Sequence, residues 1–150
     1  MAWVDLQTWF ADELSVTVEA VTNTIDLGAR PTSRSLALQN QFLVIDIPAT
    51  MTDDAIDPAT HVTFSLESDS TANLATSPTV HWKSAPIALA SLTGGTNITV
   101  LPLPVKANYE RHLGVRILPS GGSPGLLASG SVTAYLTPDP SLRTIYPDSV

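Results

Sequence analysis

The residues of this chain best suited to hold a metal ion or to move a proton are its three histidines. They are His61, His81 and His112, and they stand far apart in the sequence. A metal site on a β-strand typically needs two histidines separated by one residue, because alternate side chains of a strand point to the same side. No such pair is present, so the sequence predicts no metal ion and places the histidines at half-exposed strand positions.

Other common catalytic and binding motifs are also missing from the sequence. The chain has no cysteine, which removes one familiar nucleophile. The stretch GGSPG (121–125) has the letters Gly-x-Ser-x-Gly, but no predicted helix follows it, so it is not the strand-turn-helix elbow of a nucleophilic serine. The acids Asp53, Asp54 and Asp57 lack the regular spacing of a calcium loop, so a solvated turn is the better interpretation. The glycine-rich stretch 121–125 is not followed by the lysine and hydroxyl residue of a phosphate-binding loop. We therefore predict a protein that is not an enzyme and needs no cofactor.

The densest cluster of charged residues lies in VLPLPVKANYERHLGVRI, residues 100–117. Pro102 and Pro104 have no backbone N–H group, so this part of the chain must lie at the edge of a sheet or at the exit from a strand. Glu110 and Arg111 follow, near the start of the next predicted strand. No orienting group or oxyanion donor accompanies them, and we expect them to form an ion pair at the surface or at an interface.

The charge balance narrows the range of partners. Fourteen acidic residues against seven basic ones give a net charge of −7, and lysine and arginine form no cluster. Nucleic acids and anionic membranes are bound through such clusters, so we expect neither as a partner. No apolar run approaches the roughly 18 residues of a membrane span, and the first residues do not have the pattern of a signal peptide.

The low content of charge has two interpretations. Charged residues make up 14% of the chain, compared with about 25% in a typical soluble domain. Threonine and valine, which are abundant here, suit the surface of a β-sheet. The same composition suits an exterior that is covered by copies of the chain or by a partner, because the centres of interfaces contain few charges. Both interpretations stay open at this point.

The spacing of apolar residues predicts an all-β protein, either an antiparallel β-sandwich or a jelly roll. Residues 15–137 contain about eight short strand-like runs separated by turn residues, and the run at 60–68 alternates most clearly. The N-terminal segment 1–14 differs, because its apolar residues recur at helical spacing and predict a short helix over 3–14. The tail 138–150 contains three prolines and predicts an extended arm.

Five stretches, in this order and spacing, resemble one known family. They are NTIDLGA (23–29), HVTFSLESDST (61–71), TVLPLP (99–104), YERHLGVRI (109–117) and GSVTAYLT (130–137). Together they resemble the small capsid cement, or decoration, proteins of certain tailed phages. The resemblance implies a jelly-roll fold, homotrimers on the outer surface of the virion head, and the major capsid protein as partner. It also implies a stabilising role, and it supplies no catalytic residues.

The two ends of the chain are the expected contact elements of such a protein. They carry apolar side chains on segments too short to bury them, namely Trp3, Trp9, Phe10, Leu142, Ile145 and Tyr146. We expect these to dock on the capsid or on a neighbouring protomer; the alternative is that both ends fold back on their own sandwich. Two other functions stay open: a tail or head–tail connector protein, and a carbohydrate-binding module in which Trp82 or Tyr109 stacks on a sugar.

Overall fold

A computed structural model describes residues 9–29, 40–53, 60–103, 108–121 and 127–139 of the chain. These residues are almost entirely β-structure, and a single 3-10 turn, η2 (Leu89–Ser91), is the only helical element among them. This confirms the predicted all-β class. The strands are β1 (Trp9–Ser15), β2 (Ala20–Val21), β3 (Ile25–Asp26), β4 (Phe42–Thr52), β5 (His61–Asp69), β6 (Thr79–Lys83), β7 (Ile87–Ala88), β8 (Thr96–Pro102), β9 (His112–Ser120) and β10 (Ser129–Thr137).

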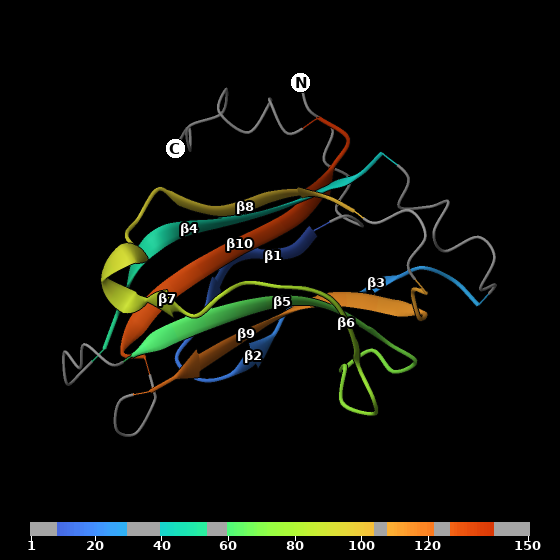
Figure 1. Ribbon diagram of the computed structural model, residues 1–150, viewed down its shortest axis with the longest axis horizontal. Coiled ribbons are helices and arrows are strands. Elements are labelled where there is room, and N and C mark those ends of the chain that lie inside the picture. The colour runs from blue at the N-terminus through green and yellow to red at the C-terminus, as the bar shows by residue number, and fades with distance from the viewer. Residues whose placement is uncertain (1–8, 30–39, 54–59, 104–107, 122–126, 140–150) are drawn as a thin grey trace.

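The strands form two antiparallel sheets that pack face to face as a sandwich. Sheet A has the order β1-β10-β4-β8, and sheet B has the order β2-β9-β5-β6, with β3 also paired to β9 and β7 to β5. Figure 1 shows sheet A above sheet B, with the first and last strands lying side by side in sheet A. Every pair is antiparallel, as the short connections in the sequence predicted.

The core lies between the two sheets and is built from alternate residues of the long strands. In sheet B, β5 contributes Val62, Phe64 and Leu66, and β9 contributes Leu113, Val115 and Ile117; all six are fully buried. In sheet A, β4 contributes Leu43, Ile45 and Ile47 in the same alternating manner. The period-two pattern of 60–68 therefore identified the inward face of β5 correctly, because successive side chains of a strand point to opposite faces.

The predicted helix over 3–14 is wrong where the structure can test it. Residues 9–15 form strand β1, which pairs with β10 through Trp9 opposite Tyr135 and Leu14 opposite Val132. The ladder contains two irregularities, and Glu13 has a φ of 48°. Each irregularity inserts a residue and changes which side chains face inward, so the apolar spacing imitates that of a helix. Residues 3–8 lie outside the described part of the chain, as do 140–150 of the predicted arm.

Candidate functional site

An ion pair joins two of the stretches that carried the family resemblance. Asp26 of NTIDLGA accepts hydrogen bonds from Arg111 of YERHLGVRI, with Nε at 3.0 and 3.1 Å from the two carboxylate oxygens and Nη2 at 2.8 Å. The Leu27 N–H donates to the Arg111 carbonyl at 2.7 Å, and the Gly28 N–H donates to Asp26 at 2.8 Å. The hydrogen bonds from Arg111 and from Gly28 hold the pKa of Asp26 well below its usual range.

The expected pairing of Glu110 with Arg111 needs correction. Arg111 turns to Asp26 across the β3–β9 pair, and the two side chains are 48% and 46% exposed. Glu110 instead accepts a hydrogen bond from the Thr79 hydroxyl at 2.9 Å, at the start of β6. Neighbours in sequence on an extended chain point to opposite sides, so each of the two finds a partner on a different strand.

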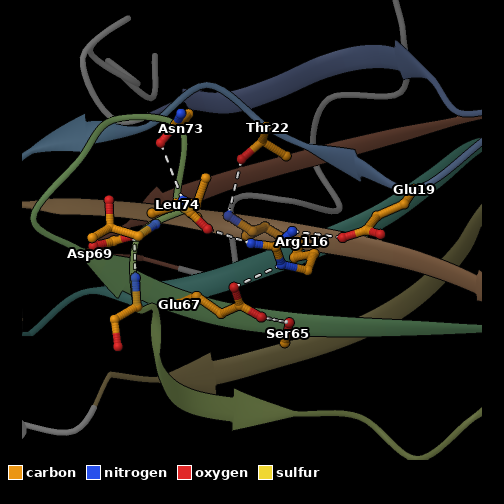
Figure 2. A network of polar contacts seen from close by, with 12 residues as sticks. Glu19, Thr22, Ser65, Glu67, Asp69, Asn73, Leu74 and Arg116 are labelled. Atoms are coloured by element: carbon orange, nitrogen blue, oxygen red, sulfur yellow. Dashed lines mark hydrogen bonds and ion pairs between the residues drawn. The ribbon is translucent and has the colours of Figure 1, made fainter.

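A second arginine, Arg116, organises the outer face of sheet B. Its Nε lies 2.9 Å from Glu67 on β5, and its Nη1 lies 2.7 Å from Glu19, which precedes β2. Its Nη2 donates to the Leu74 carbonyl at 2.7 Å. The Glu67 side chain is only 6% exposed and accepts a further bond from the Ser65 hydroxyl at 2.6 Å. Figure 2 shows this network, in which one guanidinium ties three separate segments of the chain together.

The loop of residues 70–78, which follows β5, is fixed by the carboxylate of Asp69. The carboxylate accepts hydrogen bonds from the N–H groups of Ser70 at 2.6 Å, Thr76 at 2.8 Å and Ser77 at 3.2 Å. Burial acts to raise the pKa of Asp69, but these hydrogen bonds outweigh it and lower the pKa to about 2. An ionised carboxylate is therefore a permanent anchor of the loop near neutral pH.

The same loop is also held by packing. Leu74, which adopts a φ of 51°, is fully buried on the outer side of sheet B. It lies over Gly114, where a Cβ atom would come within 3.0 Å of Leu74 Cδ1 and 2.9 Å of Thr24 Cγ2. The other residues of the loop are exposed. A polar, hydroxyl-rich surface is thus presented on a loop fixed at three points, by Asp69, by Leu74 and by the bond from Arg116.

Ser68 and His81 form the arrangement closest to a catalytic pair. The Ser68 hydroxyl lies 2.7 Å from His81 Nε2, and the His81 ring packs on Tyr109 with centroids 4.5 Å apart. Burial lowers the pKa of His81, and this effect outweighs the negative charge of Glu110, which acts to raise that pKa. Burial also raises the pKa of Tyr109 to about 12. Ser68 is fully buried, and its oxygen already accepts the Glu110 N–H at 2.9 Å. A substrate has no access to that oxygen, so the contact is structural.

The other groups considered for metal binding are scattered in the structure. His61 lies opposite Ser120 at one end of sheet B, and His112 lies opposite Asp69 at the other end of the same pair of strands. Asp53 accepts a hydrogen bond from Thr60, whereas Asp54 and Asp57 lie outside the described residues. In the part of the chain that the structure describes, no three His, Cys, Asp or Glu residues gather closely enough to hold a metal ion. Over the same residues, no helix has the length and apolar character required to cross a membrane.

The outer face of sheet A carries an apolar row that crosses all four of its strands. The row consists of Trp9 on β1, Tyr135 on β10, Val44 on β4 and Val100 on β8. Each of these residues lies directly opposite the next one on the neighbouring strand. The rings of Trp9 and Tyr135 pack with centroids 5.0 Å apart. Val44 is fully buried although its neighbours Leu43 and Ile45 face the core, and Val100 at the edge is 38% exposed.

A sequence model of the Bbp16 family matches residues 10–136, from the second residue of β1 to the last but one of β10. The chain belongs to the Bbp16 family. Bbp16 is a family of phage proteins, and the resemblance drawn from the five stretches is confirmed to that extent. Comparison with curated protein sequences gave no match. The matched region contains both sheets, the Asp26–Arg111 pair and the Arg116 network, so membership in Bbp16 applies to the whole sandwich.

The predicted contact residues have different positions in this Bbp16 sandwich. Phe10 is fully buried in the core between the sheets, so its proposed role as a contact with a partner is wrong. Trp9, one residue earlier, lies on the opposite face in the apolar row. Trp3, Leu142, Ile145 and Tyr146 lie outside the described residues. Of the two aromatic residues considered for sugar stacking, Tyr109 is 5% exposed and Trp82 packs partly against the core.

Proposed function

We propose that this Bbp16 protein is a structural component of the phage virion that decorates the outer surface of the head. In this proposal it binds the major capsid protein in many copies, as a homotrimer, and stabilises the assembled shell. The observation that carries the proposal is the family match over residues 10–136, which indicates a phage structural protein. Nucleic acid and membrane are not proposed as partners, because the net charge is −7 and basic residues are few.

The physical character of the sandwich supports a cementing role. A shell under internal pressure is stabilised when an additional protein buries surface at the junctions between its subunits. Many weak contacts act together on one particle, because each bound arm raises the effective concentration of the next. Such a protein benefits from surfaces that do not rearrange on binding. On sheet B, the ion pairs and the 70–78 loop, which is anchored by the Asp69 carboxylate, provide such a fixed outer surface.

The proposed contact elements are the two chain ends and the partly exposed members of the apolar row, Trp9, Tyr135 and Val100. Trp9, whose ring packs on Tyr135, directly follows residues 1–8 in the sequence, and these contain Trp3, another of the predicted contact residues. Variants lacking residues 1–8 or 140–150 keep all ten strands and are suitable for testing each end separately. Unchanged occupancy of both truncated proteins on the particle would remove the ends from the proposal.

The deciding experiment is the copy number of the protein in purified particles, measured by quantitative mass spectrometry against the major capsid protein. Decoration predicts hundreds of copies in a fixed ratio to the shell and labelling by antibody from outside. A few copies per particle would contradict decoration and favour a tail or head–tail connector protein. Absence from the particle would contradict both.

The trimer is tested separately from the decoration. Sedimentation equilibrium of the purified protein, and cross-linking on the particle followed by mass measurement, give the number of chains in the bound unit. Three chains per unit supports the homotrimer, since a trimer on a three-fold axis offers the same contact to three neighbours. Two chains, or one, would contradict the trimer and leave the decoration proposal standing.

A further inference from the structure

The four edges of the two described sheets are protected to different degrees against pairing with another chain. Edge strand β1 carries Asp12 and Glu13 and two irregularities, and β6 carries Lys83 and one irregularity. The edge beyond β9 is formed by β2 and β3, which have two residues each. Charges, irregularities and short length all discourage pairing at an edge. Three of the four edges are therefore protected in recognised ways.

The fourth edge, β8, has one irregularity and Pro102 at its end, but its middle residues have no such protection. It contains seven residues, Thr96–Pro102, and none of them is charged. Among the described strands it pairs only with β4. Its single irregularity lies near Asn97, whose amide donates to Ile45 O, Asp46 Oδ1 and Thr99 O and so fills the gap in the ladder. The stretch from Thr99 to Leu101 keeps regular pairing with β4 and offers its other edge to a partner strand.

We propose that β8 pairs antiparallel with β8 of a second copy of this chain, about a two-fold axis at Val100. The two four-stranded sheets then become one continuous sheet of eight strands. In this register Val100 lies opposite its own copy, and Thr99 lies opposite Leu101. β-branched residues stabilise directly opposed positions, and the 38% exposed Val100 side chain becomes covered. A two-fold contact of this kind uses the same patch on both chains.

Charge and surface pattern select a second copy as the occupant. A chain with a net charge of −7 repels its own copy over most of its surface, but the β8 edge brings together no like charges. The nearest acid on the neighbouring strand, Asp46, is hydrogen bonded by Asn97 at 2.8 Å. The pairing also joins the end of the apolar row at Val100 to the same end in the partner, so the row continues from Trp9 of one chain to Trp9 of the other.

The contact is small, because one strand of seven residues buries less than the roughly 800 Å² per partner of a standard interface. We therefore expect reversible association in solution and tighter association where a surface holds many copies close together. The inference does not depend on the proposed function. A two-fold contact joins only two chains, so a trimer needs a second contact surface away from β8.

Single-cysteine variants provide the test, because the natural chain contains no cysteine. In the proposed register the two Val100 Cα atoms lie about 4.5–5.5 Å apart, within the range that a disulfide bridges. The variant V100C, purified as the full chain and oxidised with glutathione disulfide, should give a covalent dimer as its main product on a non-reducing gel. V80C is the matched control, since Val80 is a 51% exposed valine on the edge strand β6. Equal dimer yields from V100C and V80C would overturn the proposal.

A second pair of variants tests the same edge without covalent chemistry. V100K places two ammonium groups opposite each other and should weaken self-association about tenfold or more in sedimentation velocity, whereas V80K should leave it unchanged. Thermal unfolding of both lysine variants checks that each one is folded. The proposal is overturned if V100K folds and associates as the natural chain does. It is also overturned if V100C on particles cross-links to another virion protein and not to its own copy.

Discussion

Removal of the Arg116 guanidinium should destabilise the sandwich far more than removal of the neighbouring Arg111. The substitution Arg116→Met keeps the aliphatic part of the side chain and leaves the Glu67 carboxylate, 6% exposed, without its cationic partner. Breaking a buried pair from one side costs about 3–5 kcal/mol, because the remaining charge stays desolvated. The lost bond to the Leu74 carbonyl is included in that range at about 1 kcal/mol.

Arg111→Met is the matched control. Arg111 lies five residues before Arg116 and also pairs with a carboxylate. Both side chains of the Arg111–Asp26 pair, however, are almost half exposed. Exposed pairs contribute little to stability, because water screens the two charges. Urea denaturation at one fixed protein concentration, followed by tryptophan fluorescence, gives the free energy of unfolding of each variant. The expected order of stability is natural chain, then Arg111→Met, then Arg116→Met.

A double variant identifies the cause of the effect. Adding Glu67→Gln to Arg116→Met removes the unpaired charge and should restore about 1–2 kcal/mol, since a neutral amide is less costly to bury than a carboxylate. The reasoning is refuted if Arg116→Met is no more destabilising than Arg111→Met. It is also refuted if the Glu67→Gln addition makes the protein less stable, because the loss would then arise from packing and not from the unpaired charge.

Four further predictions concern other parts of the sandwich. Gly114→Ala should lower the free energy of unfolding by about 1–3 kcal/mol, as measured in urea, because the added Cβ atom clashes with Thr24 and Leu74. The pKa of Asp69 is about 2, below its ordinary value of 3.8, so its contribution to stability is complete above pH 4 and is lost as the pH falls toward 2; Asp69→Asn should flatten this part of the pH profile of the melting temperature. His81 has a pKa below its ordinary value of 6.5, so the unfolded chain binds its proton first and stability falls as the pH drops below 6.5; His81→Gln should remove this part of the profile. Phe10→Ala should cost about 3–5 kcal/mol in the same denaturation assay, as expected of a core residue and not of a surface contact.

The sequence predicted the sandwich and its inward faces because these depend on local alternation. Val62, Phe64 and Leu66 recur at period two, and the structure buries all three between the sheets. The edge position of Pro102 was predictable in the same way, since the missing N–H group restricts where proline can pair. These properties are decided by a few neighbouring residues, so no knowledge of distant partners is required.

The features that the sequence did not reveal depend on partners far along the chain. Residues 9–15 become a strand because β10 is available to pair with them, and the irregularities of that ladder disguise the alternation. Arg111 finds Asp26, and Arg116 finds Glu19 and Glu67, across sheet pairings that local pattern cannot specify. One signal was available: Arg116 lies opposite in parity to Leu113, Val115 and Ile117, which places its charge on the outer face of the sheet.

The pairing of the first strand with the last one also determines when the protein can fold. Sheet A needs β10 between β1 and β4, so it cannot be completed until residue 137 has left the ribosome. Until then one edge of the apolar strand β4 stays unpaired, and such an edge is open to other chains. Contacts between distant segments also form slowly. Completion of sheet A therefore follows the synthesis of β10, and a chain that terminates before residue 129 is prone to aggregate.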